Sequence, residues 1–319
     1  MANQVDAPSA ISPFLPAVVF VNPAAGGGRT LSCIPRIRKV FESAFVPAEF
    51  IFVESPGDLE TKALAAIKSG KRLLFALGGD GTFHELVNAA YGADVVIGVL
   101  PAGGGNDFAA ALQIPKDTVA AVEAVLRGKP KWVDLARVRT ADGRVRLYSG
   151  GGGLGIDAEA ARYAGETFRG WPGRSRYVAS ALRAYFRHRP LRVRAEFPQS
   201  SLPPIEVDCL LAAALNTPSY GAGIRLAPDA RLDDGWLEAV IVEDLSAFQV
   251  LVLLPHLVRS GELRTARVKR FRVRAVKYST DRSCFFHGDG EILGPTPVEI
   301  EIVPQAVRVL APAQGNDFP

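Results

Sequence analysis

The sequence predicts an α/β protein of two domains, in which a doubly wound α/β domain precedes a domain that is mostly β. Up to residue 131, short apolar runs alternate with glycine loops and amphipathic segments, as in parallel strands joined by helices. From residue 132, apolar and polar residues alternate at a period of two, as in strands with one buried face. The 319 residues are enough for both domains. We therefore expect domains at 1–131 and 132–303, and residues 304–319 can return to the first.

Strand, glycine loop and helix follow one another four times in the first domain. The strands are expected at 17–23, 48–53, 72–77 and 95–101, and a helical segment begins in the stretch that follows each of them. In an open parallel sheet, ligands bind beyond the carboxyl ends of the strands. The loops after these strands are therefore the candidate binding residues.

Period-two segments make up most of the second domain. They lie at 133–139, 191–197, 205–215, 236–242, 266–276 and 298–303. The segment at 266–276 alternates strictly, so we expect a single strand with a solvated cationic face. Two helical patterns interrupt the strands. One covers 157–188 except around 170–173, and the other covers 246–258 and is interrupted by Pro255.

Composition excludes several classes of protein. Apolar residues at 48% and charged residues at 22% are ordinary proportions for a folded soluble protein, which excludes wholesale disorder and a collagen-like chain. The net charge of +4 permits attraction to phosphates or to anionic lipid without requiring it. Cys33, Cys209 and Cys284 are too scattered for a disulfide framework or a zinc cluster.

Nothing in the sequence predicts a membrane span or a secretory signal. The apolar runs, such as 209–215, fall far short of the roughly 18 residues that a spanning helix needs. The first residues lack both the cationic start and the apolar stretch of a signal peptide. We therefore expect a cytoplasmic protein.

The strongest motif is Gly-Gly-Asp-Gly-Thr at 78–82, between a buried strand and a helix. Glycines let main-chain N–H groups approach phosphate oxygens, and the N-terminus of the following helix adds partial positive charge. Asp80 would then face the metal of a nucleotide or a reacting hydroxyl group. The same residues also suit a simple tight turn.

Two more glycine loops follow neighbouring strands. Residues 22–29 come after the first strand and lack the Gly-Lys-Ser/Thr ending of a Walker A loop. Residues 101–107 come after the fourth strand and open a helix, with Asn106 as a possible N-cap. Three such loops would converge at one edge of the sheet. This conjunction predicts a phosphate site better than any one loop does.

Two acidic clusters lie in the second domain. Residues 226–236 form a turn-rich segment whose carboxylates and carbonyls can bind Mg²⁺, a hard ion that prefers oxygen. A hairpin turn at its Asp-Asp-Gly is the alternative. Residues 286–291 place Asp289 and Glu291 two positions apart, so on an extended segment the two carboxylates share one side, as a general base and its helper would. Here too a hairpin turn is the alternative.

A basic and aromatic stretch covers residues 162–189. Mixed arginines and aromatic rings are typical of a segment that lies at a membrane interface. A helix that packs its rings on the core and leaves its arginines in water explains the same pattern. The residues are Arg162, Tyr163, Phe168, Arg169, Trp171, Arg174, Arg176, Tyr177, Arg183, Tyr185, Phe186, Arg187 and Arg189. No nucleic-acid module is recognisable in the chain.

With these motifs in place, the sequence resembles the diacylglycerol kinase catalytic family, a group of lipid kinases that includes soluble bacterial enzymes, sphingosine kinases and ceramide kinases. The matching motifs run in family order over nearly the whole chain. They are NPAAGGGR, GGDGTFHELVNA, LPAGGGNDFA, GGGLGIDA, LAPDARLDDGWL and HGDGEIL. The resemblance implies an N-terminal α/β nucleotide-binding domain, a β-sandwich-like lipid-binding domain and an active site in the cleft between them.

The resemblance also implies roles for individual residues. Glu291 is similar to the family's proton acceptor, with Asp289 in support and Asp80 near the phosphates and their Mg²⁺. A structural Mg²⁺ would bind the Asp234 side chain and the carbonyl oxygens of Arg231 and Trp236. The nucleotide-binding residues implied are Asn22, Pro23, Ala24, Ala25, Gly26, Gly78, Gly79, Asp80, Gly81, Thr82 and Gly104.

Two positions depart from the family pattern. Gly104 stands where a threonine is usual, which removes a hydroxyl expected on the phosphates, and Val53 and Glu54 replace the usual threonine near the end of the second strand. The expected activity is Mg²⁺-dependent transfer of the ATP γ-phosphate to the hydroxyl of a lipid such as diacylglycerol, with peripheral contact at the inner membrane face possible. An NAD kinase-like enzyme, or a catalytically weak regulator that binds nucleotide or lipid, are the alternatives. The sequence does not identify the lipid or the oligomeric state.

Overall fold

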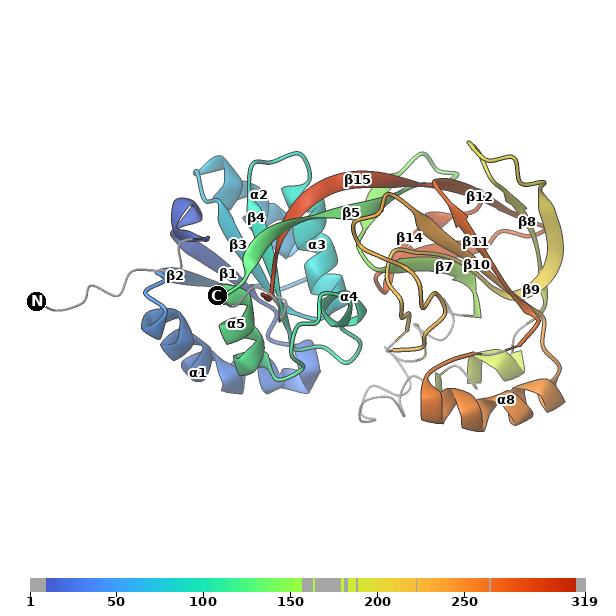
Figure 1. Ribbon diagram of the computed structural model, residues 1–319, viewed down its shortest axis with the longest axis horizontal. Coiled ribbons are helices and arrows are strands. Elements are labelled where there is room, and N and C mark those ends of the chain that lie inside the picture. Colours follow the sequence, from blue (N-terminus) through green and yellow to red (C-terminus); the bar gives the residue numbers. More distant parts are fainter. Residues whose placement is uncertain are drawn as a thin grey trace, which may run out of the picture. The chain divides into compact units, whose positions relative to one another are not determined.

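The computed structural model describes residues 10–156, 163, 179–180, 183–187, 189–221, 223–263 and 265–313 (Figure 1). The chain folds into two compact units. Unit 1 comprises Met1–Val133 together with Gln305–Pro319, and unit 2 comprises Asp134–Pro304. No helix among the described residues is long and apolar enough to cross a membrane.

Unit 1 is built on a parallel sheet. Its strands are β1 (Ala17–Val21), β2 (Ala48–Phe52), β3 (Leu73–Gly78) and β4 (Val96–Pro101), in the order β4-β3-β1-β2. Every residue of β1, β3 and β4 is buried. The last part of β15 (Val298–Ala311) pairs with β4 in parallel through Arg308 and Val309. Strands buried on both faces explain why these segments are continuous apolar runs.

Helices connect the strands of unit 1. They are η1 (Ser12–Phe14), η2 (Ala25–Gly28), α1 (Arg29–Ser43), α2 (Asp58–Lys68), α3 (Asp80–Ala90), α4 (Asp107–Ala111) and α5 (Thr118–Leu126). Helix α1 contacts α5, and α2 contacts α3 (Figure 1). The apolar side of α3, including Phe83, Leu86 and Val87, is fully buried. The doubly wound α/β prediction for this part of the chain is confirmed.

Unit 2 is mostly β. Its strands, besides β15, are β5 (Lys129–Arg139), β6 (Val145–Tyr148), β7 (Gly151–Gly155), β8 (Leu191–Glu196), β9 (Ile205–Leu215), β10 (Leu237–Glu243), β11 (Val268–Val273), β12 (Ala275–Thr280), β13 (Phe285–Gly288) and β14 (Glu291–Pro295). The strand order is β14-β13-β7-β9-β8-β12-β15. In addition, β10 pairs with β9 and β11, and β5 pairs with β15 and β6.

Strand β9 separates two hydrophobic cores. Cys209, Ala212 and Ala214 belong to one core, and the alternate residues Ala213 and Leu215 belong to the other. Helix α8 (Ala247–Ser260) helps to cover the second core. Successive side chains of a strand point to opposite faces, so this strand is buried on both sides.

Two predictions about unit 2 were wrong. The segment 266–276 is not one strand, because the chain bends at Arg274 between β11 and β12. Strand β11 pairs with β10, whereas β12 pairs with β8 and β15. A period-two pattern continues across such a bend and does not report which strand is the partner. The helix at 246–258 was expected to be interrupted at Pro255, but α8 continues through it as one helix.

Candidate functional site

Asn22 joins the first glycine loop to the neighbouring strand and helix. It follows β1, and its main-chain N–H donates to the Leu77 carbonyl at the end of β3 at 3.0 Å. Its side-chain amide donates to the buried Thr82 hydroxyl in α3 at 3.0 Å, and its Oδ1 accepts from the Ala24 N–H at 3.0 Å. The following residues Gly26–Gly28 all have positive φ, which glycine adopts without strain. The loop is thus fixed at the carboxyl end of the sheet.

Asp80 joins the second glycine loop to the third. It is the first residue of α3, and its carboxylate accepts the main-chain N–H of Asn106 at 2.7 Å. The loops also touch through their backbones, since a Cβ added at Gly103 would lie 2.6 Å from the Gly79 Cα. Only glycine at position 103 allows this approach. The predicted phosphate-type loops therefore lie together within unit 1.

Asn106 does not have its expected role as the cap of α4. Its backbone is left-handed, at φ 59°, and its side chain makes no capping hydrogen bond to the helix. Instead, its Oδ1 accepts from the Gly103 N–H at 3.2 Å and its Nδ2 donates to the Gly103 carbonyl at 2.9 Å. Asparagine tolerates this conformation because its short side chain bonds locally. Asn106 therefore closes the third loop, next to the exposed Gly104.

Asp289 and Glu291 do not lie on one extended segment, so that expectation was wrong. Residues 289–290 form the two-residue turn between β13 and β14, with positive φ at both Asp289 (52°) and Gly290 (91°). This is the pattern of the hairpin turn that matches the strand twist. The hairpin alternative is therefore the correct one. Glu291 begins β14 and is exposed.

The Asp289 carboxylate fixes the hairpin to residues 149–150, which connect β6 to β7. Its Oδ2 accepts from the main-chain N–H of Ser149 at 2.7 Å and from the Ser149 hydroxyl at 3.0 Å, and its Oδ1 accepts from the Gly150 N–H at 2.8 Å. In return, the Asp289 N–H donates to the Gly151 carbonyl at 2.9 Å. Hydrogen bonds to an ionised carboxylate are stronger than neutral ones. Asp289 thus positions the strand that carries Glu291.

A buried polar residue that was not among the predicted site residues bonds to the segment that holds this hairpin. Asn216 is fully buried, and its side-chain amide donates to the carbonyls of Asp134 at 2.9 Å and Ser149 at 3.0 Å. Asp134 in turn accepts the Gly235 N–H at 2.7 Å. A polar residue directly after the apolar run 209–215 was the signal that could have found Asn216, because buried amides are kept where they bond.

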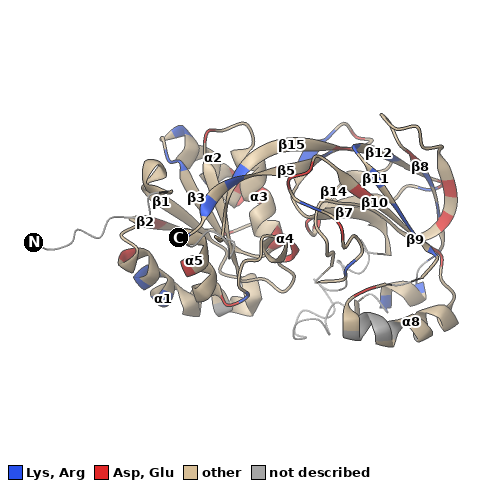
Figure 2. Cartoon of the chain, viewed as in Figure 1, with Lys and Arg blue, Asp and Glu red and all other residues tan. Residues whose placement is uncertain are grey.

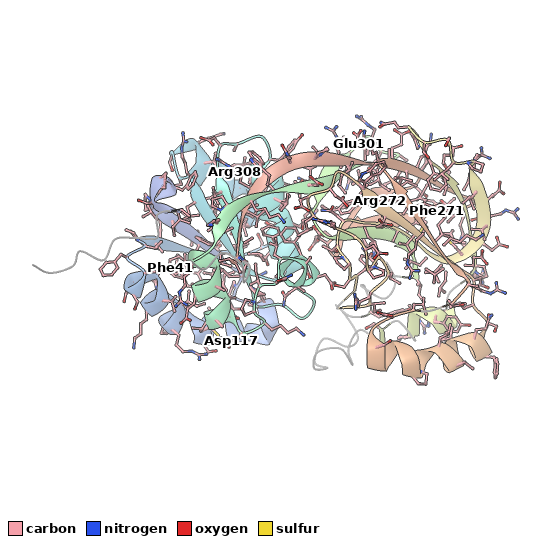
Figure 3. All side chains as sticks on the ribbon, viewed as in Figure 1. Phe41, Asp117, Phe271, Arg272, Glu301 and Arg308 are labelled. Carbon is pink, nitrogen blue, oxygen red and sulfur yellow. The ribbon has the colours of Figure 1, made fainter. Side chains whose placement is uncertain are left out.

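The Asp234 carboxylate is already paired with a cation. Arg272, labelled in Figure 3, lies 2.8 Å from its Oδ2, and its Oδ1 accepts the Trp236 N–H at 3.1 Å. The Arg272 guanidinium also lies 5.4 Å from the centre of the Trp236 ring. Nearby, desolvation raises the pKa of Glu238. The charges of Arg272 and Arg270 oppose this rise, and those of Asp229 and Asp234 add to it. The rise in the pKa of Glu238 therefore comes first from its burial.

The proposed metal ligands fit a cation only in part. Among the described residues, no three His, Cys, Asp or Glu side chains converge as metal ligands. A cation at Asp234 would therefore need the carbonyl oxygens of Arg231 and Trp236, and it would have to share the carboxylate with Arg272.

Most of the basic and aromatic stretch at 162–189 lies outside the described residues. Tyr163, Arg183, Tyr185, Phe186, Arg187 and Arg189 are described. The Arg183 guanidinium lies 4.9 Å from the centre of the Tyr163 ring, and Arg187 donates to the Tyr163 hydroxyl at 3.3 Å. Some of the described side chains are therefore packed and others are exposed, so neither of the two alternatives from the sequence applies to all of them.

Comparisons with known proteins agree over both units. Residues 16–138 match the model of the diacylglycerol kinase catalytic domain, and residues 152–311 match the YegS C-terminal NAD kinase beta sandwich-like domain. The chain is 30% identical to a diacylglycerol kinase of Mycobacterium tuberculosis over 253 residues, which is 79% of this chain and 80% of the relative. It is 24% identical to a diacylglycerol kinase of Staphylococcus carnosus over 298 residues, covering 93% and 95%.

The fold is also similar to a solved structure. A crystal structure of a diacylglycerol kinase from Bacillus anthracis str. Sterne superposes with a TM-score of 0.70 at 18% identity, over 93% of this chain and 96% of that one. The β-sandwich-like prediction for the C-terminal part is confirmed by this likeness together with the family match.

We expect Asp289→Asn to destabilise the fold. An asparagine has one acceptor oxygen in place of two, so at least one N–H of Ser149 or Gly150 loses its partner, which costs about 1–3 kcal/mol. Urea unfolding measures this loss. Glu291→Gln in the same hairpin is the matched control, because that side chain is exposed. Equal unfolding free energies for wild type and Asp289→Asn would contradict the positioning role.

Proposed function

Because the chain belongs to the diacylglycerol kinase catalytic family and is therefore a lipid kinase, we propose that it transfers the γ-phosphate of ATP to the hydroxyl of diacylglycerol in a Mg²⁺-dependent reaction. The observation that carries this proposal is the contact of the glycine loops through Asp80 and Gly103. Main-chain N–H groups on such loops are suited to the charge of a triphosphate.

We assign the nucleotide to the glycine loops of unit 1. Phosphoryl transfer requires little covalent chemistry from the protein, so positioning and charge neutralisation dominate. Asp80 lies among the loops that would receive the phosphates. A carboxylate and a triphosphate repel each other unless a cation lies between them. Mg²⁺ that accompanies ATP would supply this cation and would be held by Asp80.

The proposal makes Glu291 the acceptor of the hydroxyl proton. The lipid oxygen forms a bond to the γ-phosphorus, the bond between that phosphorus and the bridging oxygen of ADP breaks, and the hydroxyl proton passes to the Glu291 carboxylate. ADP leaves with the electron pair of the broken bond. Asp289 holds the turn through Ser149 and Gly150. It therefore acts by positioning the hairpin.

The two alternatives from the sequence have less support. An NAD kinase-like activity fits the description of the C-terminal match, but the N-terminal match and the curated relatives are lipid kinases by name. A catalytically weak regulator is suggested by Gly104 and by Val53 with Glu54, which lack the hydroxyls of the family pattern. The presence of Asp80, Asp289 and Glu291 favours an active enzyme. A cytoplasmic location with peripheral contact at the inner membrane face is part of the proposal.

We expect purified protein with labelled ATP and Mg²⁺ to phosphorylate diacylglycerol in a panel that also holds sphingosine, ceramide and NAD. The family match predicts a lipid product, and the relatives' names favour diacylglycerol within the panel. Chromatography of the labelled products identifies the acceptor. Phosphorylation of NAD with no lipid product would contradict the proposal. Label on sphingosine alone would show that sphingosine, and not diacylglycerol, is the acceptor.

We expect Glu291→Gln to lower turnover by roughly 10² to 10⁴ fold, because glutamine keeps the shape of the side chain but cannot take up a proton. ATP affinity should change little, since we assign the nucleotide to the glycine loops. Steady-state kinetics and equilibrium ATP binding separate the two effects. The control is Glu299→Gln on β15, an exposed glutamate paired with Lys277. Near-normal turnover in Glu291→Gln would remove Glu291 from the proton transfer.

We expect Mg²⁺ to raise the melting temperature through a structural site at Asp234, because a ligand that binds only the folded state stabilises it. Asp234→Ala should lose that increase. Without metal, Asp234→Ala should also be less stable than the wild type, because it loses the ion pair with Arg272. Arg272→Gln is therefore the useful control, because it removes the competing cation and should enlarge the Mg²⁺ effect. A wild-type melting temperature indifferent to Mg²⁺ would count against the site.

A further inference from the structure

Helix α8 carries apolar side chains on two of its sides. Val250 and Leu253 pack against the second core of unit 2. Phe248 and Val252 are 74% and 59% exposed, and Pro255 is exposed one turn further on. Positions i, i+4 and i+7 of a helix lie on one stripe. The helix contains no Asp or Glu, and the part of it that Figure 2 colours carries no red. A solvent-facing helix surface of this kind is unusual, because a surface helix normally turns polar residues outward.

A second helical segment adds to this stripe. The Tyr185 hydroxyl donates to the Leu245 carbonyl at 2.8 Å, two residues before α8 begins, and Tyr185 packs against the same core as the inner side of α8. Phe186 follows it and is 77% exposed, with its ring 5.6 Å from that of Tyr185. Phe186 therefore emerges beside the start of α8. We define the docking surface as Phe186, Phe248, Val252 and Pro255.

Three arginines lie near Phe186 in the chain or bond to the segment that follows it. Arg187 and Arg189 follow it closely along the chain, and the Arg282 guanidinium donates to the Pro190 carbonyl at 3.0 Å. Among the described residues, no carboxylate lies within ion-pair distance of these three. The neighbouring strand differs, because Arg192 and Arg194 on β8 are paired with Glu206 at 2.7 Å and Glu196 at 2.8 Å. Within the described part of the chain, the three arginines near Phe186 thus keep their positive charge without an ion pair, whereas the two arginines on β8 are neutralised.

We propose that the docking surface binds to an anionic lipid bilayer. Exposed aromatic and aliphatic side chains beside cationic ones are the combination that binds at a membrane interface, where apolar groups enter the acyl boundary and arginines meet anionic headgroups. The inference rests on the proposed lipid substrate, which resides in a bilayer. A second copy of the chain fits less well, because a two-fold contact through this surface would bring the same unpaired arginines together.

The first test is sedimentation of the full chain with vesicles, without nucleotide or diacylglycerol. Phosphatidylcholine vesicles that contain phosphatidylglycerol should bind the protein, and vesicles of phosphatidylcholine alone should bind it more weakly. Phe248→Ser combined with Val252→Ser should lower binding by about tenfold or more, since two apolar side chains no longer enter the bilayer. The matched control is Leu64→Ser on α2, an apolar helix residue that is 41% exposed in unit 1.

The second test concerns charge. Arg189→Gln should lower binding to the anionic vesicles about fivefold, which is the effect of about 1 kcal/mol for one arginine near such a surface. Arg194→Gln, which removes a paired arginine from the adjacent strand, should change binding little. Added salt should abolish the difference between the two variants.

Several results would overturn the inference. Equal binding to neutral and anionic vesicles would remove the charge argument, and an equal loss in Leu64→Ser would show that any exposed apolar residue suffices. A change of oligomeric state in the Phe248 and Val252 variant, with unchanged vesicle binding, would make the surface an interface between copies. Because vesicle binding is measured without turnover, an inactive protein that still binds anionic vesicles would contradict only the proposed function.

Discussion

The burial of strand β9 on both faces is the constraint on which unit 2 depends. The strand pairs with β7, β8 and β10, and its alternating side chains supply two cores. Buried tyrosine hydroxyls bond to its backbone, from Tyr278 to the Ala213 carbonyl at 2.7 Å and from Tyr148 to the Ala214 carbonyl at 3.0 Å. Burial raises the pKa of both hydroxyls, so they remain protonated donors. Small alanine side chains leave room for the two rings to approach.

The proposed site in unit 2 is connected by hydrogen bonds to the residue that follows strand β9. Asn216 follows β9 directly, and its amide reaches Ser149 and Asp134. Ser149 is held from the other side by Asp289, and Asp134 is bonded to the Gly235 N–H beside Asp234. The hairpin of Glu291 and the loop of Asp234 are thus tied to one buried amide. Placement by backbone hydrogen bonds is more precise than placement by long side chains, because fewer rotatable bonds intervene.

The sequence predicted the unit 1 site more completely than the unit 2 site. Parallel strands bring their carboxyl ends to one edge, so the meeting of the glycine loops followed from topology alone. No rule of topology fixes residues 286–291, although the Asp-Gly pair at 289–290 favours the turn locally. The bonds that hold the turn, from Asp289 to Ser149, join residues that are 140 apart in the chain. The partners of Asn216 were missed for a similar reason, because its place directly after an apolar run can mark the residue but does not reveal which distant carbonyls it bonds.

In the proposed site, electrostatics in the glycine loops would allow an anionic nucleotide and an anionic side chain to lie together. Asp80 is the first residue of α3, where the helix dipole stabilises its negative charge. The same dipole and the loop N–H groups would stabilise phosphate, so carboxylate and phosphate compete for one source of positive potential. A divalent cation held by Asp80 would remove this competition, because it would attract both anions at short range. With glycine in place of a hydroxyl residue at 104, the main-chain donors and that cation would carry more of the phosphate's charge in the proposed site.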